Sequence, residues 1–132
     1  MTDLTNLQAL IIEDNPGDTK VLQTLLSRIG MEFVTLDGSD ILMALQQVPI
    51  PDIIFLDLEL PGKNGFQVLE ELQSIPEFGE VPVVAYTSHT SEMAYARRAG
   101  FHSFLGKPLK SADFGNQVTQ IISGQSVWEV RG

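Results

Sequence analysis

The chain has 132 residues, a net charge of −9 and no cysteine, and 43% of its residues are hydrophobic. A chain of this length fits one domain whose core buries roughly two-thirds of the unfolded surface, so it needs no disulfide or structural metal. The lack of cysteine excludes disulfides, thiolate metal sites and cysteine nucleophiles. The negative charge argues against binding to nucleic acid. Because the sequence has no secretory signal and its apolar runs are too short for a membrane span, we expect a cytoplasmic protein with no membrane partner.

Short apolar runs alternate with longer segments of helical periodicity along the chain. The run 7–12 predicts a buried strand, and apolar residues spaced from Val21 to Ile29 predict the helix that follows. Asn15 is the expected N-cap of this helix, with Pro16 at its first position and Gly30 beyond its end. The same reasoning predicts later strands at 32–36, 53–56, 81–86 and 101–105, and later helices at 39–48, 64–75, 90–99 and 114–124.

This series of strand-then-helix units predicts an α/β fold in which five helices cover both faces of a doubly wound, five-stranded parallel sheet. We expect the flavodoxin-like strand order 2-1-3-4-5. We expect residues 1–132 to form a single domain, with its core at about 7–124 and a short C-terminal tail at 125–132. The sequence shows no repeat and no low-complexity segment.

Polar side chains follow the ends of the predicted strands. Glu13 and Asp14 follow the first strand, Asp57 the third, Thr87 the fourth and Lys107 the fifth. Ligand sites in open parallel sheets form outside the carboxyl ends of the strands. We therefore expect three acids, a hydroxyl and an ammonium to converge at one edge of the sheet, and the opposite edge has no comparable set.

The three carboxylates predict a site for a hard divalent cation. Carboxylates held close together repel each other unless a cation lies among them, and oxygen ligands favour Mg²⁺. A zinc site is poorly supported, because the chain has no thiol and His89 and His102 are its only histidines. A metal ion and Lys107 around carboxylates suit the negative oxygens of a phosphoryl group, and Asp57 is the best-placed nucleophile.

Four motifs follow one another along the chain: LIIEDN at 10–15, FLDLELPG at 55–62, AYTS at 85–88 and GKP at 106–108. In this order and at these spacings, they resemble those of response-regulator receiver domains over nearly the whole chain. The resemblance implies a stand-alone, CheY-like phosphoprotein of a two-component system, which is a switch with at most self-catalysed phosphorylation and dephosphorylation. Its partners would be a sensor histidine kinase or phosphotransfer protein and an unknown downstream protein, and the chain would be a monomer or weak dimer.

By this resemblance, Asp57 is the phosphoacceptor. Glu13 and Asp14 match the acid pair that holds Mg²⁺ together with Asp57. Glu59 matches the position whose main-chain carbonyl is a metal ligand, although its carboxylate stands where many members of the family carry a neutral side chain.

The resemblance also assigns the switch residues. Thr87 matches the hydroxyl residue that hydrogen-bonds the phosphoryl group, and Lys107 matches the lysine that pairs with it and precedes a cis proline. Phe104 replaces the tyrosine of many members and matches the aromatic that changes rotamer, here by turning inward on activation. The expected output surface is the face formed by the fourth helix, fifth strand and fifth helix.

Other interpretations of the same residues remain open. Thr87 could cap the next helix, Phe104 could be core packing, and the side chains of Glu59 and His89 could be solvated. For the whole chain, the alternatives are an aspartyl-phosphate phosphatase of the haloacid dehalogenase type and a scaffold that works without phosphorylation. A nucleotide-binding domain is poorly supported, because no Gly-x-Gly-x-x-Gly motif follows the first strand.

Overall fold

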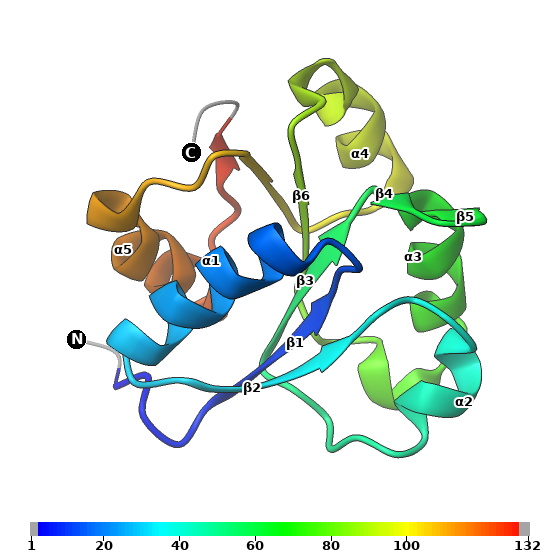
Figure 1. Cartoon of the computed structure of the whole chain (residues 1–132), viewed down its shortest axis with the longest axis horizontal. Helices are drawn as coiled ribbons and strands as arrows, with labels where there is room; N and C mark the ends of the chain where they lie inside the picture. Colours follow the sequence, from blue (N-terminus) through cyan, green and yellow to red (C-terminus); the bar gives the residue numbers. More distant parts are fainter. Residues whose placement is uncertain (1–2, 130–132) are drawn as a thin grey trace.

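A parallel sheet of six strands forms the centre of the molecule, in the order β2-β1-β3-β6-β7-β8. The structure is a computed structural model that describes residues 3–129. Figure 1 shows the strands running through the middle of the molecule, with helices on both sides. The strands are β1 (Gln8–Ile12), β2 (Glu32–Leu36), β3 (Ile53–Asp57), β6 (Val83–Thr87), β7 (Ser103–Gly106) and β8 (Trp128–Glu129).

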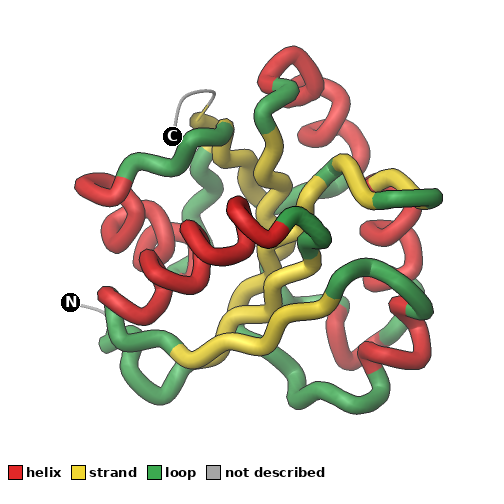
Figure 2. The backbone as a smooth tube through the Cα atoms, viewed as in Figure 1, coloured by secondary structure: helices red, strands yellow, loops and turns green. Residues whose placement is uncertain are grey.

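The helices form two groups on either side of the strands, as Figure 2 shows. One buried cluster joins the sheet to α1 (Pro16–Arg28) and α5 (Ser111–Ile122). The other joins it to α2 (Ile41–Leu45), α3 (Gly65–Gln73) and α4 (Met93–Ala99). The remaining elements are the hairpin of β4 (Glu59–Leu60) and β5 (Lys63–Asn64) and two 3₁₀ helices, η1 (Pro76–Phe78) and η2 (Thr90–Glu92).

Burial on both faces explains the continuous apolar runs of the strands. Successive side chains of a strand point to opposite faces. In β1, Leu10 lies in the cluster with α2, α3 and α4, whereas Ile11 lies in the cluster with α1 and α5. In β3, Ile54 and Phe55 divide in the same way. The doubly wound α/β fold and the predicted order of five strands are therefore confirmed.

Two predicted helices differ from the helices observed. The helix expected at 39–48 is reduced to α2. It starts late because Asp40 has a left-handed backbone with φ of 44°, and after Leu45 the N–H groups of Gln46 and Gln47 donate to carbonyls three residues back instead of four. The helix expected at 90–99 divides into η2 and α4. The N-cap prediction holds, because Asn15 accepts a hydrogen bond from the N–H of Asp18. Asn64 likewise caps α3 by accepting from the N–H of Gln67 in a capping box.

The sixth strand is a correction to the predicted count of five, and it lies in the expected C-terminal tail. β8 pairs in parallel with β7, with Trp128 opposite Phe104. The N–H of Phe104 donates to the carbonyl of Val127 at 2.8 Å, and the N–H of Val127 donates to Ser103 Oγ at 3.0 Å. The tail therefore covers the edge of β7. Between residues 3 and 129, no helix combines the length and apolarity needed to cross a bilayer.

Gly65 lies at a point where the chain packs tightly beside Asp57. A Cβ at this position would lie 2.7 Å from Leu58 Cα and 2.8 Å from the carbonyl oxygen of Asp57, both backbone atoms that cannot swing away. Gly65→Ala should therefore lower the free energy of unfolding by about 2 kcal/mol, measured by urea denaturation. The matched control is Gly115→Ala in α5, where the nearest atom would be Ile29 Cγ2 at 3.4 Å.

Gly115→Ala should leave stability unchanged or raise it by up to ~1 kcal/mol, because alanine is the better helix former. Equal effects of the two substitutions would contradict the close packing of Gly65 against the backbone that carries Asp57.

Candidate functional site

Glu13 is a buried carboxylate with hydrogen-bond donors on both oxygens. It directly follows β1, and only 2% of the residue is exposed. Its Oε2 accepts from the N–H groups of Asp14 at 3.1 Å and Asn15 at 3.2 Å. Its Oε1 accepts from the Tyr86 hydroxyl at 2.7 Å and from Lys107 Nζ at 3.0 Å. These contacts fix the orientation of the Glu13 carboxylate, whereas Asp14 is exposed.

Asp57 ends the central strand β3 and is also buried, with 4% of the residue exposed. Its Oδ1 accepts from the N–H of Glu59 at 3.1 Å and lies 3.8 Å from Lys107 Nζ. One carboxylate oxygen from each of Glu13, Asp14 and Asp57 lies within 4.8 Å of the other two. The predicted convergence of the three acids is thus present in the structure.

Thr87 and Lys107 come from adjacent strands at the same edge. Thr87 ends β6 and is wholly buried, and its Oγ1 accepts from the N–H of His89 at 3.1 Å. The N–H of Lys107 donates to the carbonyl of Thr87 at 2.9 Å, and the Lys107–Pro108 peptide bond is cis. Thr87 therefore ends the strand next to that of Asp57, and Lys107 follows the strand beyond it.

Three carboxylates surround the ammonium of Lys107. Lys107 Nζ lies 2.6 Å from Asp18 Oδ2, 3.0 Å from Glu13 Oε1 and 3.8 Å from Asp57 Oδ1. It also lies 4.5 Å from the centre of the Tyr86 ring. Asp18 and Tyr86 were not predicted as site residues, since Asp18 reads as a first-turn acid of a helix and Tyr86 as one more residue of an apolar strand.

The carboxylates titrate unequally because they share this small space. Burial, together with the neighbouring carboxylate of Glu13, raises the pKa of Asp57 to about 7. Burial opposes the charge of Glu13, but its neighbours Asp57, Tyr86 and Lys107 outweigh it and lower the pKa of Glu13. Burial likewise opposes the charge of Lys107, but Asp18 and Glu13 outweigh it and raise the pKa of Lys107.

The donor set fits a hard divalent cation. Glu13, Asp14 and Asp57 offer only oxygen atoms, and a single lysine offsets their charge within the cluster. Among the described residues, no histidine belongs to a group with metal-ligand spacing, so the acids match Mg²⁺ and not zinc.

The other residues singled out from the sequence lie either at the surface near the acids or in the core. Glu59 and His89 are exposed, and His89 Nδ1 lies 3.1 Å from Glu59 Oε2. Phe104 is fully buried in the cluster with α2, α3 and α4. Phe104 was expected to turn inward on activation, but its ring is already buried in this structure. The expectation that the ring starts outside is therefore wrong.

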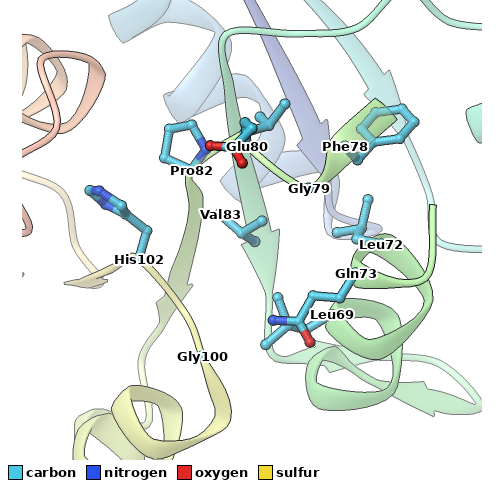
Figure 3. Close-up of a pocket in the computed structure, with 11 residues that line it drawn as sticks. Leu69, Leu72, Gln73, Phe78, Gly79, Glu80, Pro82, Val83, Gly100 and His102 are labelled. Carbon is cyan, nitrogen blue, oxygen red and sulfur yellow. The ribbon is translucent and has the colours of Figure 1, made fainter. Parts of the chain in front are cut away.

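A hollow of about 230 Å³ lies at the other edge of the sheet (Figure 3). Leu72, Phe78 and Pro82 line it, with Glu80 and His102 as its titratable residues. It adjoins the start of β6, whereas the acid cluster adjoins the ends of the strands. Among residues 3–129, the group of acids spaced to hold a metal ion is the one at the ends of the strands.

Comparison with known proteins identifies the family. The model of the response regulator receiver domain matches residues 9–119. The chain belongs to this family. As a receiver, it is 26% identical to protein PilH of Pseudomonas aeruginosa over 117 residues, which cover 87% of this chain and 97% of PilH. It is 37% identical to response regulator Rcp1 of Synechocystis over 92 residues, which cover 63% of each chain.

Solved structures show the same fold. The receiver domain of sensor histidine kinase PA1611 from Pseudomonas aeruginosa, described with magnesium coordinated in its active-site cleft, matches with a TM-score of 0.79 at 23% identity. That match covers 89% of this chain and 98% of the other. The Mn²⁺-bound form of Rcp1 matches with a TM-score of 0.69 at 29% identity, covering 89% and 92% of the two chains. By contrast, the receiver spans only 13% of the sensor protein GacS of Pseudomonas syringae.

The raised pKa of Asp57 predicts how the metal-free receiver responds to pH. Because the folded pKa of about 7 exceeds the unfolded value, the folded state binds the extra proton between about pH 4 and pH 7. The free energy of unfolding should therefore fall as pH rises through that range. Asp57→Asn removes the ionisation and should stabilise the protein by about 2 kcal/mol near pH 8, with the gain vanishing towards about pH 4.

Urea denaturation in chelator across this pH range measures the effect. Glu70→Gln in α3, which removes one exposed carboxylate away from the cluster, is the control and should show no such pH-dependent gain. A gain for Asp57→Asn that is constant from acid to alkaline pH would contradict a buried, repelled carboxylate.

Proposed function

We propose that Asp57 accepts a phosphoryl group from a sensor histidine kinase or a phosphotransfer protein in a reaction that requires Mg²⁺. The observation that carries this proposal is the position of Asp57 Oδ1, which is buried at the end of the central strand and 3.8 Å from Lys107 Nζ. Membership in the receiver family supports it, since such domains are generally phosphoacceptor switches in two-component signalling.

Transfer forms one bond and breaks one. A carboxylate oxygen of Asp57 attacks the phosphorus, and the phosphorus–nitrogen bond to the donor's imidazole breaks, with its electron pair passing to the nitrogen. A bound Mg²⁺, held by Glu13, Asp14, Asp57 and the main-chain carbonyl of Glu59, would neutralise negative charge on carboxylate and phosphoryl oxygens.

Lys107 and Thr87 would stabilise the phosphorylated product as well as assist the transfer. Lys107 lies within a short movement of Asp57 and would pair with the phosphoryl oxygens. Thr87, on the adjacent strand, accepts from the N–H of His89 through its oxygen, which leaves its hydroxyl proton available to donate to the same group. The phosphorylated receiver would then act through contact with a downstream protein and not by turnover of a substrate.

The alternative enzyme is not favoured. A haloacid dehalogenase-type phosphatase needs its aspartate nucleophile after the first strand and a second aspartate two residues later. Here Asp57 ends the third strand in sequence, and the later position is Glu59, whose carboxylate lies beside His89. The scaffold alternative predicts no phosphate uptake at all, so one measurement separates it from the proposal.

Phosphate-affinity electrophoresis with a small acyl-phosphate donor tests the proposal. The wild type should give one shifted species in Mg²⁺, and Asp57→Asn should give none, because it lacks the accepting oxygen. Excess chelator should abolish the shift, since the acids then keep their mutual repulsion. A mutant band equal to that of the wild type, or a reaction unaffected by chelator, would reject the assignment.

The Glu59–His89 contact predicts the lifetime of the phosphoryl group. The two side chains come from the loops that follow β3 and β6, and their 3.1 Å contact joins those loops beside Asp57. Glu59→Ala and His89→Ala should each change the dephosphorylation half-life about threefold or more, because each alters the approach of water. Glu70→Ala should not change it. Unchanged half-lives in both loop variants would show that these side chains are passive.

A further inference from the structure

Tyr86 has a hydroxyl group that core packing alone does not require. Its ring is 1% exposed and meets Phe55 edge-on, with 6.4 Å between ring centres. A phenylalanine would fill the same space, yet the hydroxyl of Tyr86 donates to Glu13 Oε1 at 2.7 Å. Burial and the Glu13 carboxylate raise the pKa of Tyr86 well above its usual value, so the hydroxyl keeps its proton and remains a donor.

The Glu13 carboxylate depends on this donor because water cannot replace it. The side chain of Glu13 has 0% exposure. Its Oε1 has two side-chain donors, the Tyr86 hydroxyl and Lys107 Nζ. A buried carboxylate oxygen that loses all its donors bears the full desolvation cost. If one of these two donors leaves Glu13 Oε1, the other must remain to avoid that cost.

Lys107 is the donor that a phosphoryl group on Asp57 would draw away from Glu13. In the resting structure it is drawn to Glu13 and Asp18 and lies 3.8 Å from Asp57 Oδ1. A phosphoryl group on Asp57 would bring close to two negative charges to that side of the ammonium. The Tyr86 ring, 4.5 Å from Lys107 Nζ, adds a face that a cation can occupy in this partly desolvated position.

We propose that Tyr86 is a positioning residue that holds Glu13 by its hydroxyl and so allows Lys107 to exchange Glu13 for the phosphoryl group on Asp57. This inference rests on the proposed phosphorylation of Asp57. With Tyr86 present, Glu13 Oε1 has two side-chain donors before the exchange and one after it. Without the hydroxyl, it has one before the exchange and none after. Removing the Tyr86 hydroxyl should therefore destabilise mainly the phosphorylated state.

Two titrations of Tyr86→Phe, followed by amide chemical shifts, separate this role from a structural one. The first measures Mg²⁺ affinity alone, in a state in which Lys107 still donates to Glu13. The second measures the affinity for beryllium trifluoride, a phosphoryl mimic, at a Mg²⁺ concentration that saturates each protein. The control is Tyr95→Phe, the same change at the chain's other tyrosine, which is 58% exposed on α4.

Tyr86→Phe should bind Mg²⁺ within about twofold of the wild type but bind the mimic about tenfold more weakly, the loss expected for one hydrogen bond to a buried charge. Tyr95→Phe should match the wild type in both titrations. Equal mimic affinity in Tyr86→Phe and wild type would overturn the inference. Equal losses in both titrations would also overturn it, because Tyr86 would then support only the metal site. A wild type that fails to bind the mimic would instead reject the proposed function on which the inference stands.

Discussion

The repulsion among buried carboxylates around a single lysine is the constraint on which the rest of the site depends. Glu13 and Asp57 are almost wholly buried, and with Asp18 they lie within 4 Å of one ammonium, that of Lys107. Such groups stay charged together only if donors or cations compensate them. The receiver satisfies Glu13 with two backbone N–H groups, a hydroxyl and the lysine, whereas Asp57 has one donor, the N–H of Glu59. Of the two buried carboxylates, Asp57 is thus the less compensated.

This imbalance also connects the site to the sheet. The N–H of Lys107 donates to the carbonyl of Thr87, so the ammonium-bearing residue of the site is tied by a backbone contact to the end of β6, the strand next to that of Asp57. Every residue of β3 and β6 is buried, and closely packed strands transmit small displacements instead of absorbing them. A change of charge on Asp57 therefore acts on Lys107 directly and on the ends of β6 and β7 through it.

The sequence was sufficient for the fold and for the convergence of the three acids, Thr87 and Lys107, because strand ends in a parallel sheet meet at one edge whatever the side-chain details. It was not sufficient for Tyr86 or Asp18. The apolar run of β6 marks Tyr86 as buried, but the direction of its hydroxyl depends on the register of Asp57 opposite Tyr86 across β3 and β6, which only the assembled sheet defines. β8 was missed for a different reason: two residues are too few to show a period, and its pairing depends on contacts far away in the sequence.

β8 changes what a partner can recognise. With only the five predicted strands, the expected output face of α4, β7 and α5 would present the edge of β7, whose unpaired N–H and C=O groups could accept an added strand. In this structure the Phe104 N–H already donates to Val127, and the Arg97 guanidinium lies 4.7 Å from the centre of the Trp128 ring. While β8 remains in place, recognition by strand addition to Phe104 is excluded. A protein that bound this face while β8 is in place would therefore meet β8 and the side chains of α4 and α5, and not the backbone edge of β7.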